Sequence, residues 1–167
     1  MKLLKYPLIV LSLIMLLCVI FWDDIKKLFN LLKDKAMVQF KSNVNNPFNI
    51  RANKANKWKG KTTPEGASFE HFQSIEMGIR AGIITLQTYF KKYRVNTVNG
   101  IISRFAPSTE NDTENYIKFV ADQVGVSPNN MLVPDKETLW RLSKAITAME
   151  NGYQLNRSDY EKAFRLV

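Results

Sequence analysis

A long uncharged stretch near the start constrains this chain most. No charged residue occurs between Tyr6 and Trp22, and the run from Leu3 to Trp22 is interrupted only by Lys5. As a helix these 20 residues would extend about 30 Å, which matches the hydrocarbon thickness of a bilayer. Lys5 lies near the end of the run, where its aliphatic stem lets the ammonium reach the interface. The sequence therefore predicts a transmembrane anchor over residues 1–22.

A cleaved secretory signal is the competing interpretation of this stretch, with Lys2 and Lys5 as its basic end. No small-x-small cleavage site follows the apolar run, because Phe21, Trp22 and two aspartates come next. The uncleaved, single-pass anchor is therefore preferred. The sequence does not decide on which side of the membrane the soluble domain lies, because positive charges favour the inner side and lysines flank the run at both ends.

The charge of the chain favours anionic partners. The formal net charge is +9, and without Lys2 and Lys5 it leaves 22 basic against 15 acidic residues. Such a surplus attracts wall glycans, lipid headgroups or nucleic acid. No basic run carries the regular aromatic interleaving of a nucleic-acid groove, so a bilayer and the cell wall are the expected partners. The single cysteine, Cys18, and the single histidine, His71, predict neither a disulfide nor a metal site, and no cofactor motif is present.

The rest of the chain reads as mainly α-helical. Residues 23–42 have the apolar spacing of an amphipathic helix, which could be a plain stalk continuing into the domain or could lie on anionic headgroups. Residues 43–167 are predicted to form the soluble domain, which begins with a lobe of loop or hairpin rich in Asn, Lys and Gly. Further helices are expected from Ser74 to about Tyr93, after the caps Thr97, Asp112 and Asp135, and after a capping box at Ser158–Glu161.

Gly78 and Gly82 lie one turn apart within the first of these helices. This spacing is expected to let another backbone approach the helix closely, and packing explains it better than a ligand does.

Three motifs in this domain resemble known proteins. Residues 45–51 read Asn-Asn-Pro-Phe-Asn-Ile-Arg, residues 58–60 read Trp-Lys-Gly, and residues 69–74 read Phe-Glu-His-Phe-Gln-Ser. The block resembles the substrate-side half of bacterial wall glucosaminidases, which are lysozyme-like. It resembles still more closely a family of phage and prophage structural proteins, which share Ala-Pro-x-x-Glu-Asn-Asp-Thr-x-x-Tyr-Ile (here residues 106–117) and a late Glu-Asn-Gly (here 150–152).

The resemblance implies a lysozyme-like helical domain on a membrane anchor, in a phage virion with an internal membrane or in the host inner membrane. The first function expected is a domain that engages peptidoglycan, with glycan cleavage when the phage enters or leaves the cell left open. The alternative is a non-catalytic structural membrane protein that links the virion membrane to the capsid or to other virion membrane proteins. A bacterial wall-maintenance factor with the same domain is a third interpretation.

Glycan cleavage needs a protonated carboxyl beside the glycosidic oxygen. The wall glucosaminidases carry a Glu about a dozen residues before the Asn-Asn turn, and this chain has no Glu there. Glu150 is the substitute candidate for the catalytic acid. It ends a helix with regular apolar spacing and follows Met149, which is predicted to point inward. A helix C-terminus also disfavours an ionised carboxylate. A structural role for Glu150, holding the Asn45-Asn46 turn, is the competing hypothesis. Whether the protein is an enzyme is therefore left open.

The remaining candidates are substrate-binding residues. Trp58 could stack on a sugar ring or cover the core, and Arg51 could pair with Glu150 or with a muramyl lactate. Glu110 and Tyr116, within residues 106–117, could also lie in the cleft. The substrate-binding candidates are Asn46, Arg51, Trp58, Glu110 and Tyr116.

Overall fold

The computed structural model describes residues 22, 24–31, 44–107 and 112–167. These residues belong to two compact units, and the division falls between Phe40 and Lys41. In the first unit residues 24–31 are helical, and the large apolar side chains Ile25, Leu28 and Phe29 are exposed. The predicted anchor and the later half of the predicted stalk lie outside the described residues, Trp22 excepted. No helix among the described residues is both long enough and apolar enough to cross a bilayer.

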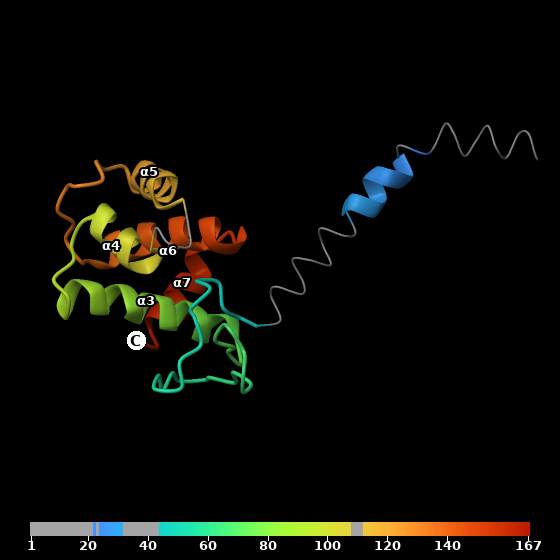
Figure 1. Cartoon of the computed structure of the whole chain (residues 1–167), viewed down its shortest axis with the longest axis horizontal. Helices are drawn as coiled ribbons and strands as arrows, with labels where there is room; N and C mark the ends of the chain where they lie inside the picture. Colours follow the sequence, from blue (N-terminus) through green and yellow to red (C-terminus); the bar gives the residue numbers. More distant parts are fainter. Residues whose placement is uncertain (1–21, 23, 32–43, 108–111) are drawn as a thin grey trace, which may run out of the picture. The chain divides into compact units, whose positions relative to one another are not determined.

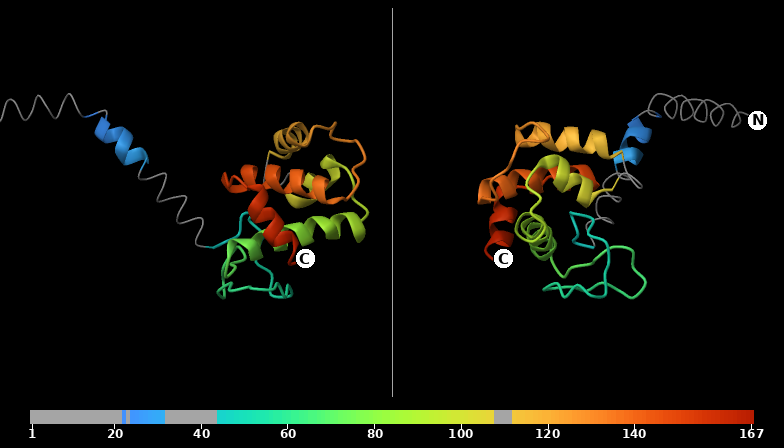
Figure 2. Two further views of the ribbon diagram at one scale, coloured as in Figure 1. Left: turned by 180° about the vertical axis from the view of Figure 1, so that it is seen from behind. Right: turned by 60° about the vertical axis from the view of Figure 1, so that its left-hand side comes forward.

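The second unit is mainly α-helical, as the sequence predicts (Figure 1). Helix α6 packs against α5 and α3, α4 packs against α5, and α7 packs against α3. The views in Figure 2 show α7 lying beside α3 close to the C-terminus. The helices are α3 (Ile75–Lys91), α4 (Val98–Phe105), α5 (Thr113–Val124), α6 (Lys136–Asn151) and α7 (Arg157–Phe164).

Three of the predicted N-caps are confirmed. The side chains of Thr97, Asp112 and Asp135 accept hydrogen bonds from backbone N–H groups in the first turns of α4, α5 and α6. Each bond satisfies one of the donors that a helix start leaves without a partner. The stops at Gly125 and Gly152 are left-handed, a conformation that glycine adopts without a steric penalty.

One helix start lacks its predicted side-chain bond, and another differs in position. Ser74 occupies the N-cap position of α3, but its side chain makes no cap hydrogen bond. The last helix begins before the predicted capping box, because Asn156 accepts from the Asp159 N–H and opens α7 at Arg157. Asn is as good a cap as Ser, so the earlier of two candidate caps was available to the chain. Helix α3 ends at Lys91, two residues short of Tyr93.

Residues 44–72 form a lobe with little regular structure. Among the described residues of this lobe, strand pairing is limited to two isolated antiparallel bridges, Arg51 with Phe69 and Lys61 with Phe72. Asn45 and Asn49 adopt left-handed backbone conformations, with φ of 49° and 46°. Asparagine tolerates this region better than other non-glycine residues. The two asparagines therefore allow the sharp turn of residues 45–49.

The lobe meets the helices through Phe48, which is fully buried and belongs to the same core as α3 to α7. Gly78 and Gly82 create the space for this contact, as the sequence predicts. A Cβ on Gly78 would lie 1.8 Å from the backbone oxygen of Asn45, and a Cβ on Gly82 would lie 2.2 Å from the Phe48 ring. The Asn-Asn turn therefore lies directly against α3, and this contact fixes the lobe beside the end of α6.

Candidate functional site

The C-terminal end of α6 presents Glu150 to the lobe. The helix stops at Gly152, whose N–H donates to the Ala148 carbonyl, while the N–H of Tyr153 donates to the Thr147 carbonyl. This paired bonding closes the helix in the usual glycine-dependent way. Glu150 is partly buried. Met149 is 42% exposed, so the prediction that it points inward is wrong: the core face of α6 ends at Thr147.

Two side chains hold the Glu150 carboxyl. The Asn49 amide donates to Oε2 at 3.1 Å and to the Glu150 backbone oxygen at 2.8 Å. The Tyr116 hydroxyl, on α5, donates to Oε1 at 2.9 Å. Both carboxyl oxygens are therefore fixed by partners from different parts of the chain.

Neighbouring bonds join the same two segments. The Asn151 amide donates to the backbone oxygens of Asn46 and Pro47, at 3.4 and 3.1 Å. The Asn46 side chain is buried and closes its own turn: it donates to the carbonyls of Ile50 and Glu70 and accepts from the Ile50 N–H. The contact expected between the Asn-Asn turn and residues 150–152 is thus present, through the Asn46 backbone. The Asn45 side-chain amide instead donates to the backbone carbonyl of Phe72.

Burial raises the pKa of Glu150 above its usual value, although the hydrogen bonds from Tyr116 and Asn49 and the charge of Arg51 act in the opposite direction. The pKa of Tyr116 is also raised well above its usual range, first by burial and then by the Glu150 charge and hydrogen bond. The Tyr116 hydroxyl therefore stays protonated and serves as a donor. A carboxyl with a raised pKa keeps its proton to higher pH than an ordinary carboxyl, which suits it to donate that proton.

Glu150 lines a pocket of about 630 Å³ between the lobe and the helices. Two cations with aromatic neighbours stand at this pocket: Arg51 lies 5.5 Å over the Phe69 ring, and Arg104 lies 3.6 Å over Tyr93 and 5.5 Å over Tyr89. Aromatic faces and fixed donors are the usual means of holding a sugar or another polar ring. The pocket is lined by Asn49, Ile50, Arg51, Phe69, Thr85, Tyr89, Arg104, Phe105, Ala106, Pro107 and Glu150.

Trp58 lies elsewhere. It lines a second pocket, of about 660 Å³, within the lobe, together with Lys54, Lys57 and Lys61. Its indole nitrogen is buried and makes no hydrogen bond to the described residues. The structure therefore brings Arg51 and Tyr116 to Glu150 but does not bring Trp58 there. Glu110 lies outside the described residues.

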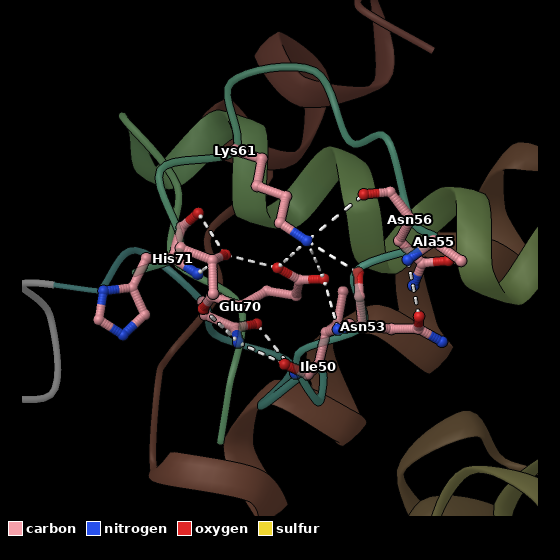
Figure 3. A network of polar contacts seen from close by, with 9 residues as sticks. Ile50, Asn53, Ala55, Asn56, Lys61, Glu70 and His71 are labelled. Atoms are coloured by element: carbon pink, nitrogen blue, oxygen red, sulfur yellow. Dashed lines mark hydrogen bonds and ion pairs between the residues drawn. The ribbon is translucent and has the colours of Figure 1, made fainter. Parts of the chain in front are cut away.

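Glu70 is a second buried carboxylate, and the sequence reasoning did not single it out. It is fully buried within the lobe and forms an ion pair with Lys61 at 2.9 Å. The Thr63 hydroxyl and the Asn53 N–H also donate to it (Figure 3). Burial raises the pKa of Glu70, but the hydrogen bonds from Thr63, Lys61 and Asn53 outweigh it and hold the pKa below its usual value. The His71 backbone takes part in this network by donating to Thr63, whereas its imidazole ring points away in Figure 3.

The sequence reasoning also missed three residues of the Glu150 pocket: Asn49, Tyr89 and Arg104. Asn49 could have been found, because it stands in the quoted turn and is one of few residue types suited to a left-handed backbone. Tyr89 and Arg104 carry no local signal, since only the packing of α3 and α4 brings them to the pocket. Within the described residues, no three His, Cys, Asp or Glu side chains gather closely enough to hold a metal ion.

No known protein-family model matches this sequence. A phage protein does match it: over 111 residues the chain is 42% identical to protein P5 of Pseudoalteromonas phage PM2, and the match covers 65% of this chain and 68% of P5. This chain belongs to the P5 family. Membership in the P5 family makes it a phage protein, as the resemblance of its motifs implied.

Proposed function

We propose that this P5-family member is a membrane-anchored, virion-associated protein whose domain is lysozyme-like and binds peptidoglycan glycan in the Glu150 pocket. Its relationship to a phage protein supports the setting, and the apolar length of residues 3–22 supports the anchor. The bilayer would be the virion internal membrane or the host inner membrane.

One observation carries the glycan-binding proposal. A partly buried carboxyl with a raised pKa lines a pocket that also presents aromatic rings and two arginines. Stacking faces suit a sugar ring, and cations suit the carboxylate of a muramyl lactate or of its peptide. The position between a small lobe and a helical body agrees with the two-lobe arrangement of lysozyme-like folds.

Cleavage in this pocket would have to use one carboxyl. Among the lining residues, all of which are described, Glu150 is the one acidic side chain. Hydrolysis with two carboxylates flanking the bond is therefore not supported. A single Glu, acting first as acid and then as base in a lytic transglycosylase scheme, is the cleavage mechanism that fits the lining residues.

A non-catalytic role is the second candidate, and the hydrogen bonds of Glu150 favour it. Asn49 and Tyr116 occupy both carboxyl oxygens, and Asn151 ties the same helix end to the turn. In this role the domain links the virion membrane to the capsid, and Glu150 joins the lobe to the helices.

The change Glu150→Gln separates the two candidates. Gln keeps the shape of the side chain but cannot supply the proton that cleavage requires. An enzyme would lose at least about 100-fold of its activity on purified peptidoglycan, and its wild-type activity would fall as pH rises through the raised pKa of Glu150. If Glu150 is structural instead, the change to Gln should lower the free energy of unfolding by about 1–3 kcal/mol. Turbidity clearing, muropeptide analysis and urea unfolding measure these outcomes.

Glu114→Gln is the matched control, because Glu114 is exposed on α5 and does not line the pocket. Sedimentation with purified peptidoglycan tests binding alone. Soluble muropeptides released by the wild type and by Glu114→Gln, but not by a stably folded Glu150→Gln, establish catalysis. Binding without release leaves a glycan-binding domain. Failure of the wild type to sediment with peptidoglycan overturns the glycan-binding proposal and leaves the structural role.

A further inference from the structure

Two exposed apolar side chains stand on the domain surface away from the Glu150 pocket. Met131 is 78% exposed and Val133 is 68% exposed, while Leu132 between them is buried. The alternation turns Leu132 into the core and its two neighbours to solvent. Large apolar side chains at such exposure gain nothing from the fold that carries them, so an apolar contact outside the chain is what would use them.

The segment that carries them is held in place by backbone bonds to the α3–α4 connection. The Leu132 N–H donates to the Asn96 carbonyl at 2.7 Å, and the Asn99 N–H donates to the Pro128 carbonyl at 2.9 Å. Figure 1 shows this segment, in orange, beside the C-terminal end of α3. Met131 and Val133 are therefore presented by a fixed scaffold, and ordering them on contact costs little backbone entropy.

Three cations lie at and just after the C-terminal end of α3, next to the connection that backbone bonds join to this segment. Lys91, Lys92 and Arg94 are all exposed, and none forms an ion pair with a described residue. The nearest acidic residue along the chain, Asp135, accepts from the Thr138 N–H and caps α6. We call residues 91–94 together with 131–133 the basic apolar tip. The three cations of the tip have no acidic partner among the described residues, and the tip also carries the exposed Met131 and Val133.

A notch of about 260 Å³ lies at the same place. Lys91 and Arg94 line it together with apolar side chains. Cations beside apolar side chains suit a phosphate group attached to a hydrocarbon, because each part meets its complement. The notch is lined by Phe90, Lys91, Arg94, Asn96, Leu132 and Pro134, without a carboxylate among them.

We propose that the basic apolar tip docks on a bilayer that contains anionic lipid, with Met131 and Val133 inserted among the headgroups and the three cations on lipid phosphates. The combination of protruding apolar side chains and unpaired cations distinguishes this surface from a purely electrostatic patch. A protein partner would need an acidic rim around an apolar hollow, whereas a bilayer supplies both over any area. The domain thereby holds a membrane contact that is separate from the predicted anchor.

Vesicle flotation of the isolated second unit, beginning at residue 41, tests the docking. The unit contains all of its own core, since the core cluster runs from Phe48 to Ala163, and the predicted anchor is absent from it. The vesicles are phosphatidylcholine alone or phosphatidylcholine with about 30% phosphatidylglycerol, because anionic lipid supplies the attraction. The unit is expected to float with the anionic vesicles, and less so as salt screens the charges.

Two sets of variants dissect the tip. Met131→Ser with Val133→Ser removes the inserted groups, and Lys91→Gln, Lys92→Gln and Arg94→Asn together remove the charge. Asn suits position 94, whose φ is 57°. Neutralising the three cations should lower vesicle affinity by about 100-fold, at roughly fivefold for each cation near the surface. The serine pair should lower it as well, at unchanged net charge.

The matched control is Lys57→Gln, Lys59→Gln and Lys144→Gln, which removes three exposed charges elsewhere in the unit. Charges more than about 10 Å from the surface are screened at ~0.1 M salt, so the control should lose little affinity. Circular dichroism melting confirms that each variant folds. A wild-type unit that does not float with anionic vesicles overturns the proposal. Equal losses in the control and tip triples, or no loss in the serine pair, overturn it too.

Discussion

Two glutamates of the same domain have opposite pKa shifts because they have different partners. Glu70 faces a lysine and several donors, so its charged form is favoured although it is buried. Glu150 is held by a hydroxyl and an amide, and there burial dominates. Below the usual carboxyl pKa Glu150 contributes stability that is lost as pH rises through its raised pKa. Glu70 behaves in the opposite sense.

Glu70→Gln should lower the free energy of unfolding by about 3 kcal/mol at pH 7, the lower end for breaking a buried pair, since its partner Lys61 is partly exposed. In the wild type Glu70 stabilises the folded state at pH values above the ordinary glutamate pKa of 4.5. This stabilisation is lost as pH falls through the lowered pKa of Glu70. The variant should therefore lose less stability than the wild type on acidification. Urea unfolding at several pH values measures both effects.

Glu65→Gln is the control for this prediction. Glu65 pairs with Lys54 at 2.8 Å, but both side chains are more than 80% exposed, so the change should cost less than about 1 kcal/mol. Similar losses at positions 65 and 70 would show that the Glu70 network does not hold the lobe.

At the scale of elements, the contact of the Asn-Asn turn with α3 requires glycine at two positions of the helix. Gly78 and Gly82 leave room for the Asn45 backbone and the Phe48 ring. Glycine in a helix costs roughly 1 kcal/mol relative to alanine. The chain accepts this cost because the space lets the turn reach α3 and, through Asn49, the end of α6.

Gly78→Ala and Gly82→Ala should each destabilise the domain by about 1–3 kcal/mol, because the steric overlap outweighs the gain in helix propensity. Gly78→Ala should be the worse of the two, since the atom it meets is backbone. Thermal melting measures the loss, and Gln87→Ala on the same helix, expected to stay within about 0.5 kcal/mol of wild type, is the control. A melting temperature raised by either alanine would contradict the contact.

Sequence patterns predicted the helices of this domain well and its pocket only in part. Thr97, Asp112, Asp135 and the glycine stops act within one turn of themselves, so a local pattern identifies them. The start of the last helix was misjudged because both Asn156 and Ser158 could cap it, and Asn156 does. Tyr89 and Arg104 reach the Glu150 pocket only through the packing of separate helices, and no spacing along the chain encodes that position.

At the scale of the whole molecule, the second unit carries its own core. Every residue of the core cluster lies between Phe48 and Ala163. The described helical residues of the first unit instead expose their apolar side chains, Phe29 at 67%. The second unit therefore draws its hydrophobic stabilisation from its own residues.

Removing the first 40 residues should leave the unfolding midpoint of the second unit unchanged within about 2 °C, because its core cluster lies wholly within residues 48–163. The same deletion should release the protein from membranes at alkaline pH, whereas the full chain, with its predicted anchor, stays in the pellet. Calorimetry and alkaline extraction measure the two results. A drop of ~10 °C or more would show that the first unit stabilises the second.

Asn49 and Glu150 are bonded partners 101 positions apart. At ribosomal rates of about 5–20 residues per second, roughly 5–20 s pass between synthesis of the turn and synthesis of its partner. Within that interval α3 is completed first, so the nascent lobe can pack on α3 before α6 exists. The bonds of the lobe to Glu150 and Asn151 therefore form only after α6 has been made, and until then the lobe should be more accessible to proteases than in the folded domain.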